Sequence, residues 1–306
     1  MPERIEKNDF AELKRQLESS RYKHSDAITP EKLFHYTDAR GILGILGSQK
    51  LWATHVHYLN DTAEIRHTQE LIEESYFSLI EQARPDEKAK LDSNNPLWIY
   101  RDFLHYIRYR TARVRMDSDF FVTCFCTKDD LLSQWRGYGN GGFGYAVGFD
   151  TGRLKYPCNG FELCKVIYSK EKQKQIIDEI LETVTISLKK MTKTMNVDRA
   201  ESIIETHAHI FEEEVAKYSV FFKHSSFSEE DEWRLVYLPV EGTIKYRAGR
   251  LGITPYIEID LPDGKNNVAS IRIGPTVQPE LARKALDMLA TGYQHIEILS
   301  SDIPLR

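Results

Sequence analysis

The chain has 306 residues, of which 41% are hydrophobic and 28% are charged, and its formal net charge is −5. These are ordinary values for a globular protein with a substantial core. The acidic total does not indicate general nucleic-acid binding, although it leaves room for a local basic face. No apolar run is long enough to cross a bilayer, and the N-terminal residues are too charged for a signal peptide, so we expect a cytoplasmic protein without membrane contact.

The first half of the chain alternates short strands with helices. Asp38 stands where it can cap the second helix, whose apolar residues recur at helical spacing. The predicted elements, in chain order, are a polar helix (5–20), the strand KLFHYT (32–37), the helix DARGILGILGSQ (38–49), the strand KLWATH (50–55), a helix from about 61 to 83 and a helix at 97–115.

The second half is strand-rich apart from the long helical periodicity of residues 170–220. Strands before and after helical segments predict one α+β domain over 1–306, with helical insertions at about 61–115 and 170–220. The other predicted elements are the strands DFFVTCFC (119–126), GFGYAVGFD (142–150), CKVIYS (164–169), EWRLVYL (232–238), YIEIDL (256–261), VASIRIGP (268–275) and HIEILSS (295–301), and the helices DDLLSQWRGYG (129–139) and PELARKALDMLATGY (279–293).

The sequence has no dinucleotide fingerprint G-x-G-x-x-G between a strand and a helix, and no phosphate loop. A doubly wound nucleotide-binding fold is therefore not expected. Any nucleotide must be held in another way.

Alternating residues of the strand near 232 predict a polar face that carries Glu230, Glu232 and Arg234, with the residues between them facing the core. Two carboxylates and a guanidinium suit a cationic or hydroxyl-rich ligand. The alternative is an exposed, salt-bridged strand, in which such pairs contribute only about 0–1 kcal/mol.

Two other clusters have both a structural and a functional interpretation. In LLSQWRGYG, Ser133 lies on one helical turn with Arg136, and Trp135 and Tyr138 form a pair that either clamps a flat ring or packs in the core. At the end of KLFHYT, the polar residues from His35 to Thr37 form a structural corner, a set of metal ligands or one wall of a small-molecule site.

A metal site is not expected. His55, His57 and Asp61, with His35 and His67 as possible neighbours, depart from the usual ligand spacing of hydrolases that use a His-x-His pair. The four cysteines (Cys124, Cys126, Cys158, Cys164) follow no disulfide or zinc pattern, so we expect reduced thiols.

Several pieces of the sequence, in this order, resemble an uncharacterised bacterial domain family. They are FHYT, GILGIL, LWAT, YLNDTAEI, FCT, LLSQWRGYG, GYAVGFD, FSEEDEWRLVY, IRIGPTV and ILSSDIPLR, and they run from about Leu33 to the C-terminus. That family in turn resembles, more distantly, the ADP-ribosyltransferases of the His-Tyr-Glu type, including toxins of toxin–antitoxin pairs that modify DNA. The resemblance implies a split, bent, mixed or antiparallel β core that binds NAD in its cleft.

The resemblance also implies roles for individual residues. His35 matches the histidine that binds the adenosine-side ribose, and Thr37 matches a position that faces the nicotinamide amide in some relatives. Tyr138, with Trp135 nearby, matches the aromatic residue that stacks on nicotinamide, and Tyr36, Tyr58 and Tyr145 are its rivals. The remaining expected site residues are the catalytic Glu232, the acceptor-orienting Glu230, and Ser133, Asn60, Asp61 and Arg234 as further contacts to NAD.

The function implied by this resemblance is NAD-dependent mono-ADP-ribosylation by a toxin or anti-phage effector, without a metal. The acceptor would be RNA, DNA or a host protein, and an antitoxin or chaperone would be a further partner. The basic, aromatic segments 106–115 and 244–250 favour a nucleic acid unless they are simply solvated faces. The alternatives are an NAD glycohydrolase, an inactive module that binds a nucleotide or a partner protein, and a metal-dependent hydrolase that uses His55 and His57.

Overall fold

The computed structural model describes residues 2–23, 28–59, 63–83, 97–111, 120–139, 143–154, 161–192, 199–237, 244–249, 252–261, 267–293 and 296–304. It confirms the α+β class. The chain divides into two compact units. Unit 1 contains residues 1–26, 61–118 and 167–225, and unit 2 contains residues 27–60, 119–166 and 226–306.

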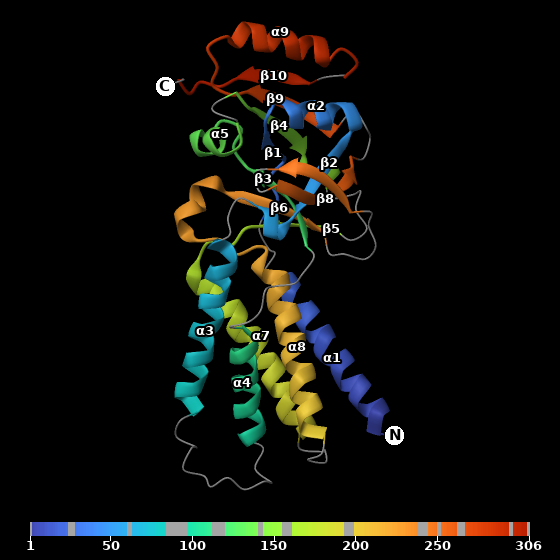
Figure 1. The fold of residues 1–306 in the computed structure, drawn as a ribbon, viewed down its shortest axis with the longest axis vertical. Coiled ribbons are helices and arrows are strands. Elements are labelled where there is room, and N and C mark those ends of the chain that lie inside the picture. Colours follow the sequence, from blue (N-terminus) through green and yellow to red (C-terminus); the bar gives the residue numbers. More distant parts are fainter. Residues whose placement is uncertain are drawn as a thin grey trace. The chain divides into compact units, whose positions relative to one another are not determined.

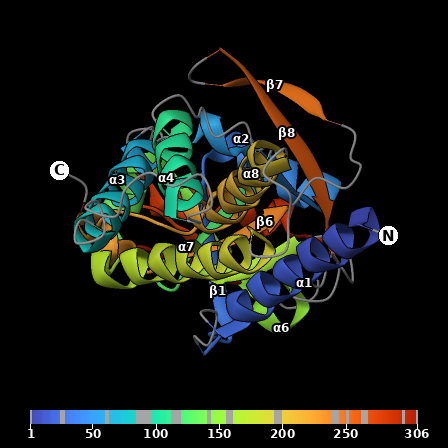
Figure 2. The ribbon, with the colours of Figure 1, turned by 90° about the horizontal axis from the view of Figure 1, so that it is seen from below.

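Unit 1 is helical, and its helices run alongside one another (Figures 1 and 2). Helix α7 contacts each of the other four helices, and α4 also packs on α8. The apolar residues of α7 recur every three or four positions, so one face of the helix is buried from Ile176 to Met191. The helices are α1 (Pro2–Lys23), α3 (Ala63–Ala83), α4 (Leu97–Thr111), α7 (Lys170–Thr192) and α8 (Ala200–Ser219).

These five helices confirm the helical pattern expected for the N-terminus and for both insertions. The long periodic segment 170–220 forms two helices, α7 and α8. None of the helices in the described ranges combines the length and the apolar character that crossing a bilayer requires.

Unit 2 is built on a mixed, mostly antiparallel sheet. The strand order is β10-β9-β4-β1-β3-β2-β8-β7, with β6 paired to β3 and β5 paired to β6. Strands β9 and β10 are parallel, and the other described pairs are antiparallel. The strands are β1 (Lys32–Thr37), β2 (Lys50–His55), β3 (Phe121–Cys126), β4 (Tyr145–Asp150), β5 (Phe161–Lys165), β6 (Glu232–Tyr237), β7 (Lys245–Gly249), β8 (Gly252–Asp260), β9 (Val268–Ile273) and β10 (Glu297–Ser300).

Strand β3 is the point at which the sheet splits. One of its edges pairs with β6 along the whole strand. The other edge pairs with β1 only at Cys126, through Phe34, and with β2 only at Phe121 and Val122. Strands β1 and β2 therefore diverge from each other beside the middle of β3, as the split core in the resemblance would require.

Short helices cover parts of this sheet. Apolar residues of α2 (Ala39–Ser48) and α9 (Pro279–Leu289) join the strand residues Leu33, Phe149 and Ile271 in one core. Helix α5 (Leu132–Tyr138) packs on β1, and α6 (Thr151–Leu154) follows β4. The 3₁₀ turns η1 (Val56–Tyr58) and η4 (Ser225–Glu230) follow β2 and precede β6.

Two strands differ from their predictions. Strand β7 was not predicted, because residues 244–249 are mostly exposed and show no apolar alternation. It forms a hairpin with β8, which is visible at the edge of the sheet in Figure 2. Strand β5 (Phe161–Lys165) begins and ends earlier than the predicted strand CKVIYS, whose Ile167 instead forms an isolated bridge with Phe222 in unit 1.

Candidate functional site: a pocket at the split of the sheet

A pocket of about 300 Å³ lies where β1 and β2 diverge. Ligand pockets span roughly 300–1,000 Å³, so this volume suits a small ligand or part of a larger one. Strand β3 supplies one side of the pocket, the β1–α2 junction a second side and strand β2 a third. The lining residues are His35, Tyr36, Thr37, Asp38, Gly41, Gly44, Ile45, Lys50, Leu51, Trp52, Thr54, Tyr58, Leu59, Val122, Thr123, Cys124, Tyr138 and Arg247.

His35 connects β1 to β3 inside the split. Its Nδ1 lies 2.9 Å from the backbone carbonyl oxygen of Cys124. A carbonyl oxygen only accepts hydrogen bonds, so Nδ1 must carry the proton, and Nε2 of the neutral ring is an acceptor. Burial lowers the pKa of His35; the bond to Cys124 opposes this effect, and the charge of Arg247 adds to it. His35 is therefore neutral at physiological pH and can accept a hydrogen bond from a ligand hydroxyl.

Thr37 lines the pocket because the first turn of α2 leaves room for it. Asp38 caps this helix as predicted, and its Oδ1 accepts a 2.8 Å hydrogen bond from the backbone N–H of Gly41. A Cβ atom at Gly41 would overlap Oγ1 of Thr37. The glycine in TDARG thus leaves space for the Thr37 side chain beside the first turn of α2.

Arg247 reaches the pocket from the β7–β8 hairpin. Its Nη2 donates a 2.8 Å hydrogen bond to Oγ1 of Thr54, and its guanidinium lies 5.3 Å from the ring centroid of Trp52 and 5.8 Å from that of Tyr256. Strand β8 pairs with β7 through Thr254 and with β2 through Tyr256, so the side chain spans β8. Burial lowers the pKa of Arg247, but an arginine in a protein stays charged.

Sequence reasoning assigned no pocket role to Lys50, Trp52 or Thr54, and treated Arg247 only as part of a basic segment. The available signal was the alternation in KLWATH, which places these three β2 residues on one face of the strand. The position of Arg247 depends on the pairing of three strands, which local sequence does not reveal.

The predicted aromatic pair of α5 is divided between the pocket and the core. Tyr138 is 39% exposed and lines the pocket. Trp135 is buried, and its ring meets that of Tyr36 edge-on, with 4.6 Å between the centroids. Ser133 is exposed and lies outside the lining. Of the two expected aromatic contacts, the structure places only Tyr138 beside His35 and Thr37.

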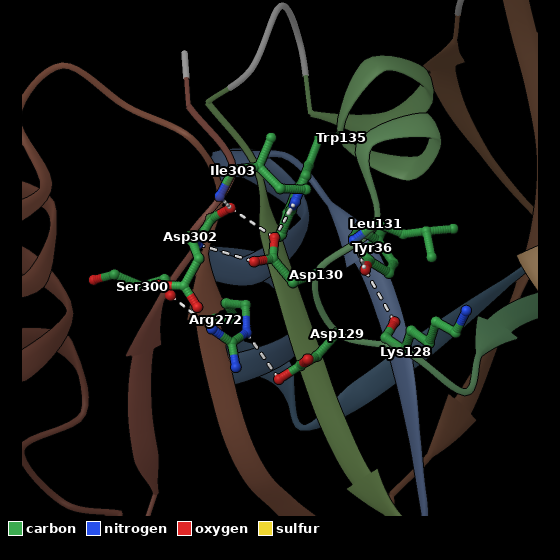
Figure 3. Close-up of polar contacts among 11 residues, drawn as sticks. Tyr36, Lys128, Asp129, Asp130, Leu131, Trp135, Arg272, Ser300, Asp302 and Ile303 are labelled. Atoms are coloured by element: carbon green, nitrogen blue, oxygen red, sulfur yellow. Dashed lines mark hydrogen bonds and ion pairs between the residues drawn. The ribbon is translucent and has the colours of Figure 1, made fainter.

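Polar contacts of Asp130 join α5 to the C-terminal segment (Figure 3). Asp130 accepts hydrogen bonds from Nε1 of Trp135 at 2.8 Å, from Oγ of Ser301 at 2.6 Å and from the backbone N–H of Asp302 at 2.9 Å. The pieces WRGY and ILSSDIPLR thus meet at one carboxylate, and Trp135 has a structural role in anchoring the helix that carries Tyr138.

Tyr36 hydrogen-bonds to the backbone on either side of Asp130, and its burial confirms that neighbouring residues of β1 face opposite sides. Its hydroxyl donates to the carbonyl oxygen of Lys128 at 2.9 Å and accepts from the backbone N–H of Leu131 at 3.0 Å (Figure 3). Nearby, Arg272 pairs with Asp129. Tyr36 therefore packs in the core, as predicted, while the side chain of His35 contacts the β3 backbone in the split.

Glu232 and Arg234 form a buried ion pair on β6. Their exposed fractions are 3% and 1%, and Arg234 donates from Nε to Oε1 at 2.8 Å and from Nη2 to Oε2 at 3.1 Å. The alternative of an exposed salt-bridged strand is therefore wrong. Arg234 is the register partner of Cys124, so the pair lies one strand away from the pocket and outside its lining. The core-facing residues predicted on this strand, Trp233 among them, are confirmed.

Glu230 does not share the face of Glu232, contrary to the prediction. It ends the 3₁₀ turn η4, and Asp231, with a φ of 41°, separates it from β6. A positive φ breaks the extended backbone on which strand alternation depends.

The other expected site residues are placed as follows. Asn60 and Asp61 lie outside the described residues, as does Cys158, while Cys124, Cys126 and Cys164 form no disulfide with one another. The rings of His55 and His57 lie 5.2 Å apart, and His67 belongs to unit 1, where it contacts Gln173 at 2.8 Å. Within the described ranges, no three His, Cys, Asp or Glu side chains are grouped as metal ligands would be.

Comparison with known proteins gives one match. Residues 134–235 match the model of a family described as Protein of unknown function (DUF2971). This range contains Trp135, Tyr138, Glu232 and Arg234, but it does not include β1 and its His35. No curated protein and no solved structure matches the chain.

Proposed function

We propose that the chain is an NAD-dependent mono-ADP-ribosyltransferase and that the pocket at the split of the sheet is its NAD site. One observation carries the proposal: His35 and Thr37 from one sequence motif and Tyr138 from a distant one line the same pocket. The resemblance to His-Tyr-Glu ADP-ribosyltransferases assigns all three residues to the NAD site.

The chemistry of each residue type supports this assignment. The Nε2 lone pair of neutral His35 accepts a hydrogen bond from a ribose hydroxyl and thereby orients the ligand. The exposed ring of Tyr138 offers a surface on which nicotinamide can stack. Breaking the nicotinamide–ribose bond develops positive charge on the ribose, which a nearby carboxylate stabilises, as in glycoside hydrolysis.

Glu232 is the proposed carboxylate. It lies on the strand next to β3, and Arg234 holds it as an ion pair. Because Glu232 is outside the pocket lining, catalysis requires the carboxylate to approach the ligand. The same placement favours a second candidate, a module that binds a nucleotide without turning it over.

The proposed setting is a cytoplasmic toxin or anti-phage effector that modifies RNA, DNA or a host protein, with an antitoxin or chaperone as a possible partner. In the basic segments, Tyr246 of β7 is 66% exposed, and the exposed Arg108 of α4 lies 5.3 Å from the ring centroid of the exposed Phe77. Exposed aromatic and cationic groups of this kind suit a nucleic-acid acceptor.

The test is incubation with adenylate-labelled NAD and a cell lysate, comparing the wild type with Glu232→Gln. Glu229→Gln, which changes an exposed carboxylate in η4, is the matched control and should behave as the wild type. We expect label on a macromolecule with the wild type and the control, and none with Glu232→Gln. Sensitivity of the label to nuclease or to protease identifies the acceptor.

Other outcomes separate the alternatives. Free ADP-ribose without a labelled macromolecule indicates an NAD glycohydrolase. NAD binding that survives Glu232→Gln, with no nicotinamide release by any variant, indicates the inactive binding module. A folded wild-type protein that neither binds NAD nor releases nicotinamide contradicts the proposal.

A further inference from the structure

Three basic side chains lie on one face of the β2–β8–β7 part of the sheet, beside the pocket. Lys50 is 3.3 Å from a carboxylate oxygen of Glu258 and 3.0 Å from one of Asp260. Lys245 is 2.9 Å from the other oxygen of Glu258. Both ammonium groups are therefore neutralised by carboxylates of β8.

Arg247 is the third basic residue, and its surroundings are different. Among the residues that the structure describes, no carboxylate oxygen lies within 4.0 Å of its guanidinium. The more distant negative charge of Asp38 raises the pKa of Arg247. Its contacts are the hydroxyl of Thr54 and the rings of Trp52 and Tyr256. Its Nε atom is buried and has no hydrogen-bond partner.

A partly buried charge without a counter-ion is unusual, because buried charges are normally paired. The carboxylate of Asp38, which caps α2 through Gly41, raises the pKa of Arg247 from a distance but forms no ion pair with its guanidinium within 4.0 Å. The two aromatic rings and Thr54 also limit how the guanidinium can turn. Arg247 is thus a fixed cation that lines the pocket and has a hydrogen-bond donor to spare.

We propose that Arg247 binds a phosphate group of the pocket's ligand, so that the pocket selects phosphate esters and diphosphates over nucleosides. A guanidinium matches phosphate oxygens with several N–H donors held in a rigid plane. The inference rests on the proposed function in one respect, because it names the ligand class of the same pocket. Lys50 and Lys245 are excluded as the main phosphate ligands, since their charges are already neutralised.

The experiment measures the affinity of the full-length chain for ADP-ribose and for adenosine by calorimetry. Arg247→Gln removes the charge, and Lys245→Gln, on the same exposed strand, is the matched control. We expect Arg247→Gln to weaken ADP-ribose binding by about 10- to 100-fold, as for a lost hydrogen bond to a charged group, and to leave adenosine binding unchanged. Lys245→Gln should bind both ligands as the wild type does.

Arg247→Lys provides a second measurement if the glutamine variant does not fold. It keeps the charge but not the planar donors, so we expect a smaller loss of ADP-ribose affinity, with adenosine again unaffected. Equal ADP-ribose affinity of the wild type and a folded Arg247 variant would overturn the inference. So would a wild-type protein that binds adenosine as tightly as ADP-ribose.

The inference and the proposed function can fail separately. ADP-ribose binding that depends on Arg247, with no nicotinamide released from NAD, would contradict the transferase proposal and support the phosphate site. Nicotinamide release with the same KM for NAD in wild type and Arg247→Gln would support the transferase and contradict the phosphate site.

Discussion

Arg234 and Arg247 belong to the same compact unit but lie in opposite chemical surroundings. Arg234 is buried and donates two hydrogen bonds to one carboxylate, Glu232. Arg247 lines the pocket, where its nearest protein partners are a hydroxyl and two aromatic rings. Arg234 forms its ion pair within the fold and contributes to stability. Arg247 has an N–H donor without a protein partner in the described part of the chain and is therefore available to a ligand.

The histidines show the same contrast. His207 in unit 1 is fully buried, and both its ring nitrogens have protein partners, Ile203 and Ser187. His35 has one ring nitrogen on Cys124 and lines the pocket. The difference separates polar groups that serve the fold from those that are available to a ligand.

Breaking the Glu232–Arg234 pair should have the largest effect on stability. Arg234→Met leaves the carboxylate of Glu232 buried without its partner, so we expect the free energy of unfolding to fall by about 3–5 kcal/mol in urea denaturation. The double variant Glu232→Leu/Arg234→Met should recover much of this loss, because it also removes the carboxylate that Arg234 pairs with. Lys170→Met, which breaks an exposed pair with Glu74, is the control. An Arg234→Met loss no larger than that of the control would contradict the structural role of the pair.

The buried His207 should make stability depend on pH. Burial lowers its pKa from 6.5 to about 4, so the folded state favours the neutral ring. Its contribution is complete above about pH 6.5 and disappears as the pH falls toward 4, a change of about 3 kcal/mol. The measurement is the difference in unfolding free energy between wild type and His207→Gln at pH 7 and pH 4.5. A difference that does not change with pH would exclude a neutral, buried His207.

Removing the Tyr36 hydroxyl should have a smaller effect. Tyr36→Phe leaves the backbone N–H of Leu131 without its acceptor, so we expect a loss of about 1–3 kcal/mol in the free energy of unfolding. The melting temperature of this variant, compared with that of the exposed substitution Tyr246→Phe, measures the effect. Equal melting temperatures would contradict a stabilising role for the hydrogen bonds of the Tyr36 hydroxyl.

The smallest expected effect is that of pH on ligand binding through His35. Its pKa lies below the ordinary value, so the ring stays neutral and Nε2 remains an acceptor from pH 8 to pH 7. ADP-ribose affinity should therefore be constant over this range and fall only at lower pH. Affinity that rises as the pH approaches 6 would indicate that the protonated ring binds the ligand.

Local sequence patterns were sufficient to predict several features of unit 2. The bounds of β1 and β2, the helix cap at Asp38, and the opposite orientations of His35 and Tyr36 all follow from alternation and capping. These features depend on residues close together in the sequence, where side-chain direction is set by backbone periodicity.

The features that sequence did not reveal depend on distant pairing. Glu232 lies on β6, an interior strand between β3 and β5, and Arg247 reaches the pocket because β7 pairs with β8 and β8 with β2. The helical spacing of Trp135 and Tyr138 shows that they are neighbours, but it does not tell which of them faces the core. Asp231, with its positive φ, removed Glu230 from the strand without any change in the apolar pattern.

The most direct test of the central claim is a crystal structure of the chain with an NAD analogue that cannot be cleaved. The account predicts the analogue in the pocket between β1 and β2, with a ribose hydroxyl within hydrogen-bond distance of Nε2 of His35, the diphosphate against Arg247 and the nicotinamide ring on Tyr138. An analogue bound elsewhere on the chain, or a pocket that stays empty at concentrations that saturate binding, would contradict it.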